Sequence, residues 1–214
     1  MFNRYYATLY NIHTIINHYG FKYHWKDITK EKFFNYTFVP IEVTPSMDKY
    51  LAEIHDDRLV LGENILQRGM FCPFFFFQKN NQNLLFMGKH RLQGLLKYHK
   101  QYKFDKKFLF IEYHSDPWGK KVESDKISNT YPMLYRWEDE KIYKVRPETY
   151  ADLNHMLVEN GDRLSRWLYD FKIEPSPIIN DEKLFEEFIN KPFDLPLEIN
   201  IKEEVIDGGT YTAI

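Results

Sequence analysis

Two short, almost wholly apolar segments near the middle of the chain constrain its fold most strongly. Residues 70–78 and 84–87 are too short for typical helices and are apolar almost without a break, so they are predicted to be buried strands. The polar residues 79–83 between them predict a turn. Gly88 ends the second segment, and leucines at helical spacing follow it, so the pattern predicts strand, turn, strand, glycine and helix.

The rest of the chain alternates predicted helices and strands around this unit. Apolar spacing and glycine or proline stops predict helices at residues 5–19, 47–54, 56–69, 148–171 and 181–190, strands at residues 38–43 and 107–113, a loop at residues 115–129, and a hairpin that pairs residues 133–137 with 141–145. We therefore expect an α+β protein with a small mixed sheet and flanking helices. Its expected parts are a helical N-terminal cover (1–37), a core (38–113), a hairpin and helix extension (114–173) and an acidic C-terminal appendage (174–214).

Charge is distributed unevenly, although the net charge is only −2. Residues 174–214 hold ten acidic residues and three lysines, whereas residues 88–107 hold seven Lys/Arg and one Asp. A basic patch of this kind suits a nucleotide or nucleic acid, and a solvated helix face is the alternative. The candidate nucleic-acid contacts are Lys97, Lys100, Lys103, Lys106 and Lys107. The acidic segment is expected to form one short helix or to stay mobile and to shield the basic residues, although its phenylalanines could instead anchor it to the main domain.

The sequence also limits the compartment and the partners. A single cysteine, Cys72, rules out an internal disulfide and reads as a small buried apolar residue. No apolar run suits a signal peptide, and residues 74–77 are far too few to span a bilayer, so no membrane partner is expected. The many Asn, Lys, Tyr and Phe residues favour an AT-rich genome. A cytoplasmic protein of a bacterial or phage-infected cell is therefore expected.

The turn Gly88-Lys89-His90-Arg91 is the clearest candidate for a binding site. A helix start leaves backbone N–H groups unpaired at the positive end of the helix dipole, which suits an anion. Gly88 allows a sharp turn and a close approach to the backbone. Lys89 and Arg91 supply charge and donors to phosphate oxygens, and His90 could donate or act as an acid or base. Cations here are unfavourable for the helix itself, and such conflicts are expected at functional sites.

Residues 38–113 resemble the ParB/sulfiredoxin-like fold, also known as the ParB-like N-terminal domain. Members have a helix ending in glycine, a strand led by proline, a second strand, and Gly-x-(His/Arg)-Arg opening a helix. The matching residues, in order, are Gly69, Pro73, Gly88, His90, Arg91 and Leu95. Residues 41–45 are similar to the strand and proline that precede the first helices of the family.

The resemblance implies nucleotide binding (ATP, ADP or CTP), with Gly88, Lys89, His90 and Arg91 on the phosphates. Glu63 and Asn64 lie on a helix that faces this pocket in the family, so they are candidate ligands for Mg²⁺. Glu63 and His90 are the candidate catalytic acid or base. The alternative for Glu63 and Asn64 is an ordinary exposed helix face.

This chain also departs from the family pattern. Met87 stands where kinase-like members place Asp, which removes one possible metal ligand or base. Lys89 stands where sulfiredoxins place their reactive cysteine, so sulfinic acid repair is not expected. No helix-turn-helix pattern follows Lys107, so a role in chromosome partition is not expected either.

Two kinds of function remain open on these grounds. The first is a nucleotide- or phosphate-binding protein. If it is an enzyme, it is expected to be a phosphotransferase or NTP hydrolase in which Mg²⁺ bridges the phosphates. The second is a non-catalytic phage or mobile-element protein that binds DNA or another protein through the same fold. A nuclease is a third idea, but no carboxylate cluster in the sequence favours it.

Overall fold

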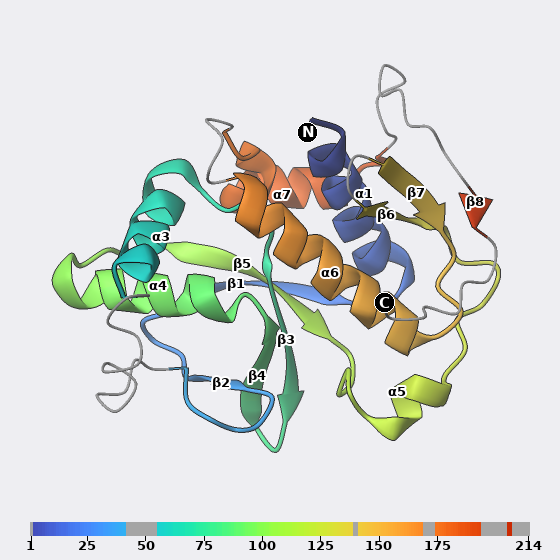
Figure 1. The fold of residues 1–214 in the computed structure, drawn as a ribbon, viewed down its shortest axis with the longest axis horizontal. Coiled ribbons are helices and arrows are strands. Elements are labelled where there is room, and N and C mark those ends of the chain that lie inside the picture. Colours follow the sequence, from blue (N-terminus) through green and yellow to red (C-terminus); the bar gives the residue numbers. More distant parts are fainter. Residues whose placement is uncertain (1, 42–54, 139–140, 169–173, 194–204, 207–214) are drawn as a thin grey trace.

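The computed structural model describes residues 2–41, 55–138, 141–168, 174–193 and 205–206. Figure 1 shows the elements formed by these residues. In chain order they are α1 (Phe2–His18), β1 (Lys22–Asp27), β2 (Phe33–Asn35), α3 (His55–Arg68), β3 (Phe74–Lys79), β4 (Gln82–Met87), α4 (Lys89–Gln101), β5 (Lys107–Tyr113), α5 (Lys120–Ser124), β6 (Leu134–Glu138), β7 (Lys141–Val145), α6 (Tyr150–Leu168), the 3₁₀ turn η1 (Pro177–Asn180), α7 (Glu182–Ile189) and β8 (Val205–Ile206).

The centre of the molecule is a mixed five-stranded sheet in the order β1-β5-β3-β4-β2. The pairs β3–β5 and β2–β4 are parallel, and the pairs β1–β5 and β3–β4 are antiparallel. A smaller sheet contains the hairpin β6–β7 with β8 beside it. The α+β class and the small mixed sheet predicted from the sequence are therefore confirmed.

The predicted strand, turn, strand, glycine and helix unit is present. Asn80 and Asn81 both have positive φ, 52° and 59°, which is the geometry of a two-residue hairpin turn between right-twisted strands. The first strand begins later than predicted, because residues 70–73 lead into β3 without joining the sheet. The four phenylalanines at 74–77 are all buried, as the apolar run indicated.

Helices cover both faces of the sheet. Phe110 and Ile111 are successive residues of β5 and so point to opposite faces. Phe74 lies beside Phe110 in the register and packs against α4, whereas Tyr23 lies beside Ile111 and packs against Phe185 of α7. In Figure 1, α3 and α4 lie together, apart from the group formed by α1, α6 and α7.

The N-terminal segment contributes more than a helical cover. The predicted helix is α1, but β1 and β2 then form the two edges of the central sheet. The strand predicted at residues 38–43 is wrong for residues 38–41, because Phe38 has φ 64° and the chain turns there, leaving one isolated bridge between Phe34 and Pro40. The helix predicted at residues 47–54 lies outside the described residues.

The C-terminal segment is part of the core as far as it is described. The predicted short helix is α7, and Ile179 and Phe185 are fully buried. Asn180 accepts a hydrogen bond from the backbone N–H of Met70 and donates one to its carbonyl. The phenylalanine-anchored arrangement is therefore the one that residues 174–193 adopt. No described helix is long and apolar enough to cross a membrane.

Two smaller predictions changed at the other end of the chain. The predicted loop at residues 115–129 contains the short helix α5. The long helix predicted at residues 148–171 is α6, which runs from Tyr150 to Leu168 and passes through Gly161 without a break. Gly161 instead allows close packing, because a methyl group there would lie 2.2 Å from the sulfur of Met87.

Candidate binding site at the start of α4

The start of α4 has no side-chain cap from its N-cap residue. Gly88 occupies the N-cap with φ 101° and, having no side chain, makes no capping hydrogen bond. That turn also contains no acidic residue. Because capping side chains or carboxylates usually satisfy this end of a helix, the first turn of α4 keeps its positive character.

Lys89 and His90 add to this positive character. Lys89 is partly buried and has no ion-pair partner in the part of the chain that the structure describes, and His90 is exposed. A cation at a helix N-terminus opposes the helix dipole. The arrangement is favourable once an anion occupies the turn, which is the environment the sequence predicted.

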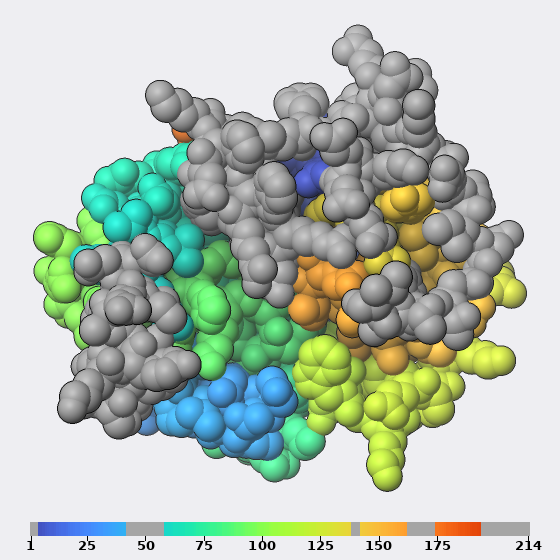
Figure 2. Space-filling view, viewed as in Figure 1, coloured from blue at the N-terminus to red at the C-terminus, as the bar shows by residue number. Residues whose placement is uncertain are grey.

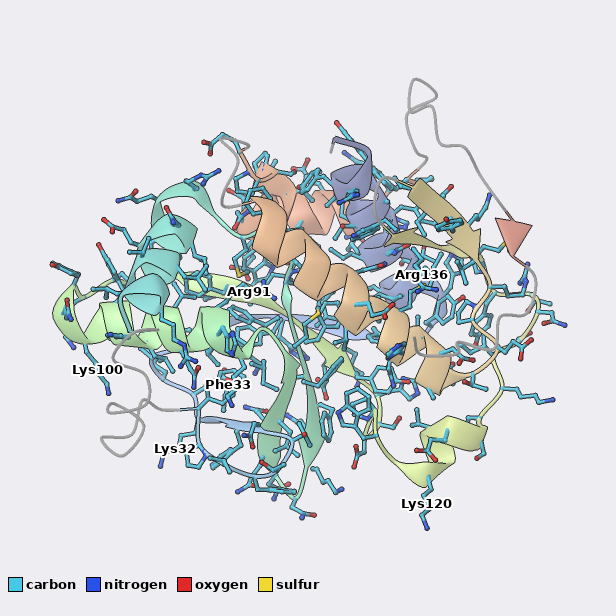
Figure 3. The ribbon with its side chains drawn as sticks, viewed as in Figure 1. Lys32, Phe33, Arg91, Lys100, Lys120 and Arg136 are labelled. Carbon is cyan, nitrogen blue, oxygen red and sulfur yellow. The ribbon has the colours of Figure 1, made fainter. Side chains whose placement is uncertain are left out.

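Arg91 has a different role from the one predicted. It is only 4% exposed, and its guanidinium donates to the carbonyl oxygens of Cys72 and Pro73, the latter at 3.2 Å. It also lies 5.0 Å from the centre of the Phe74 ring. Figure 3 places Arg91 at the inner end of α4, near β3. These contacts commit the guanidinium to the core, so the geometry gives Arg91 a structural role and does not support phosphate binding.

Gly88 and Arg91 shape the turn together. A methyl group at position 88 would lie 2.5 Å from Cδ1 of Phe74 and 3.0 Å from Nη2 of Arg91. The left-handed conformation and the close approach of Phe74 both require glycine here. The Gly-x-x-Arg spacing is therefore explained by local packing as well as by any ligand.

Glu63 and Asn64 lie on α3, as predicted, but no described contact joins them to the turn. Glu63 is exposed, and its carboxylate accepts a hydrogen bond of 3.0 Å from Gln67 of the same helix. Within the described ranges, no three His, Cys, Asp or Glu side chains gather closely enough to hold a metal ion. A Mg²⁺ ion would therefore depend mainly on the phosphates of its ligand, as this ion often does.

The helices α3 and α4 meet at two glycines. A methyl group at Gly62 would lie 2.4 Å from the carbonyl oxygen of Gly94, and one at Gly94 would lie 2.4 Å from the carbonyl oxygen of Arg58. The two backbones are thus in direct contact, about one and a half turns after Lys89. This crossing fixes α3 against α4 and leaves no room for larger side chains.

Arg58 lies at this crossing and was missed by the sequence analysis. Its Nε and Nη1 atoms are buried and have no hydrogen-bond partner among the described residues, and burial lowers the pKa of its guanidinium. The Oε1 atom of the buried Gln93, next to Gly94, also lacks a partner there. No sequence motif marks Arg58. The feature that distinguishes it is that its buried donors have no hydrogen-bond partner among the described residues, and this is visible only in the folded structure.

The predicted basic stretch is divided between three elements. Lys97 and Lys100 lie on α4, Lys103 and Lys106 follow it, and Lys107 begins β5, so the stretch is not one helix. Lys100 and Lys103 are exposed with no ion pair to another described residue, and Figure 3 shows Lys100 pointing away from the outer end of α4.

The other lysines of the stretch are less available. Lys106 lies over the Phe108 ring, 5.8 Å from its centre, and burial lowers its pKa. Lys107 lies 3.5 Å from the carboxylate of Glu182 in α7. That ion pair is one direct contact between the acidic segment and the basic stretch.

Neither protein-family models, nor curated proteins, nor solved structures match this chain. The resemblance to the ParB/sulfiredoxin-like fold therefore remains a prediction from the sequence.

Proposed function

We propose that this protein binds a phosphate-bearing ligand, in the first instance a nucleotide, at the first turn of α4. The observation that carries the proposal is a helix start with no capping side chain and no acidic residue, followed at once by Lys89 and His90. The backbone N–H groups of the first turn and the positive end of the helix dipole suit a phosphate, and Lys89 adds a full charge.

Each residue of the turn has a role in this proposal. Gly88 opens the backbone to the ligand, Lys89 neutralises phosphate charge, and His90 donates a hydrogen bond from the exposed side of the helix. Arg91 supports the turn from inside through the carbonyls of Cys72 and Pro73. If the protein is a phosphotransferase or NTP hydrolase, His90 or Glu63 is the acid or base, and Mg²⁺ is carried with the nucleotide.

A thermal-shift panel tests the proposal. ATP, ADP, CTP and GTP, each with and without Mg²⁺, would be added to the full chain. A ligand at 100 times its Kd stabilises the native state by about 2.7 kcal/mol, so binding should raise Tm. The Lys89→Ala variant should lose most of this shift.

Lys120→Ala is the matched control, because Lys120 is an exposed lysine on α5, which Figure 2 shows on the opposite side of the molecule from α3 and α4. This variant should keep the full shift. No shift with any nucleotide, or an equal shift in Lys89→Ala, would contradict the proposal.

A second candidate function is non-catalytic nucleic-acid binding, as expected of a phage or mobile-element protein. Lys100 and Lys103 favour it, because both are exposed and neither forms an ion pair with a described residue. The logarithm of the binding constant for duplex DNA should fall linearly with the logarithm of the salt concentration. Each phosphate contact that is lost should reduce the magnitude of this slope by about 0.9. The double variant Lys100→Ala/Lys103→Ala should therefore reduce the slope by about 1.8. No binding of the native protein at low salt, or an unchanged slope in the double variant, would contradict this candidate function.

A further inference from the structure

Arg58 is a charged side chain whose buried donors lack a hydrogen-bond partner among the described residues. Its Nε and Nη1 atoms are out of contact with water, and no described residue accepts a hydrogen bond from them. Leaving a charged donor buried and unsatisfied costs more free energy than leaving a neutral one in that state. A native structure that retains such a group calls for a missing partner, such as a water or an ion.

Other arginines of the protein show how the chain normally satisfies this side chain. Arg91 and Arg146 donate to backbone carbonyls, and Arg68 and Arg136 pair with glutamates. Arg136 also keeps its Nε atom buried without a hydrogen-bond partner among the described residues, but its Nη2 atom lies 3.4 Å from the carboxylate of Glu159. Arg58 differs because two of its nitrogen atoms lack a partner and it forms no ion pair with a described residue.

The crossing of α3 and α4 holds Arg58 in place. The glycine contacts bring the carbonyl oxygen of Arg58 against Gly94, so its main chain is fixed relative to α4. The residue is still partly exposed, so part of the side chain reaches solvent, and a small ligand has to displace the atoms that cover Nε and Nη1. A guanidinium with desolvated donors on a fixed main chain is suited to an oxyanion, because charge-assisted hydrogen bonds are strongest away from water.

We propose that Arg58 is the anchor of an oxyanion-binding position at the α3–α4 crossing, with phosphate as the ligand group. This position does not depend on the N-terminal turn of α4, so it goes beyond the function proposed above. The phosphate comes either from a free phosphate compound or from a nucleic-acid backbone, and both present the same oxygens to the guanidinium.

Thermal unfolding in the presence of inorganic pyrophosphate tests this position, with sodium chloride at matched ionic strength as the blank. The full chain should gain Tm with pyrophosphate. Arg58→Met, which keeps the length of the side chain without its charge, should weaken pyrophosphate binding at least tenfold. Arg58→Lys, which keeps the charge without the planar fork, should retain an intermediate affinity.

The Lys89→Ala variant separates this position from the turn. If Arg58→Met loses pyrophosphate binding and Lys89→Ala keeps it, the crossing is a site of its own. If Lys89→Ala loses binding and Arg58→Met keeps it, or if pyrophosphate does not stabilise the full chain, the assignment to Arg58 is overturned. A short single-stranded oligonucleotide that displaces pyrophosphate identifies a nucleic-acid backbone as the source, whereas failure to displace it identifies a free phosphate compound.

Discussion

Arg91 and Arg58 are two arginines within reach of the same helix, and the protein treats them in opposite ways. Arg91 is almost fully buried, yet its guanidinium donates to two carbonyl oxygens and lies over an aromatic ring. Arg58 is more exposed, yet two of its nitrogen atoms are buried without a partner among the described residues. Partnership, more than depth, therefore distinguishes the arginine that is committed to the fold from the one that we propose for a ligand.

The contacts of the two arginines also differ from what the sequence analysis led us to expect. The motif pointed to Arg91 as the phosphate ligand, and its chemistry would suit that role if the side chain faced outward. Cys72 and Pro73 lead into β3 just below the turn, and their carbonyls receive the guanidinium instead. The arginine that we propose for an anion is the one that no motif marks.

The largest effect is expected when the satisfied arginine is removed. Arg91→Met should lower the free energy of unfolding by about 3 kcal/mol or more, because two charge-assisted hydrogen bonds to carbonyl oxygens in the core are lost. Urea denaturation followed by circular dichroism measures this. Val60→Ala, at an exposed position of α3, should stay within about 0.5 kcal/mol of the native protein. A small loss for Arg91→Met would mean that the carbonyl contacts contribute little.

A smaller effect is expected at the helix crossing. Gly94→Ala should cost about 1–3 kcal/mol, because the added methyl group meets the carbonyl oxygen of Arg58 and forces α3 away from α4. The same change should weaken pyrophosphate binding, because it moves the main chain that carries Arg58. Denaturation and pyrophosphate titration of one variant therefore test both statements, and full stability would show that the helices can separate freely.

The smallest of these effects concerns a neutral side chain with partners. Asn180→Ala should cost about 1–2 kcal/mol, because the backbone N–H and carbonyl of Met70 lose their side-chain partner. It should leave ligand binding unchanged, since Asn180 lies in η1 and contacts neither α4 nor Arg58 in the described residues. A binding defect in this variant would show that the loss of stability itself disturbs the site.

The sequence predicted the centre of the fold well because its signals there are local. The apolar run at 74–77, the Asn80–Asn81 turn and Gly88 each specify one conformation, and the structure has the hairpin and helix they imply. The edge strands of the central sheet were harder to predict from the sequence. Residues 22–27 alternate polar and aromatic side chains without a strong apolar period, so β1 is specified by its pairing with β5 and not by local pattern.

The site was only partly predictable for a related reason. The sequence shows that Lys89, His90 and Arg91 follow a glycine at a helix start, and the structure has that helix start. It cannot show which way a guanidinium turns, since that depends on carbonyls 18 and 19 residues away. Nor can it show a missing partner such as that of Arg58, which appears only when α3 and α4 are packed together.

The most direct test of this account compares the two arginines without any ligand. Free energies of unfolding would be measured in phosphate-free buffer for the native protein, Arg91→Met and Arg58→Met. The account predicts opposite behaviour: Arg91→Met loses about 3 kcal/mol or more, whereas Arg58→Met is unchanged or more stable, because replacing a buried charge by an apolar group of similar volume is often neutral or stabilising. Similar losses in both variants would show that Arg58 already has a partner in the protein, and would contradict the account.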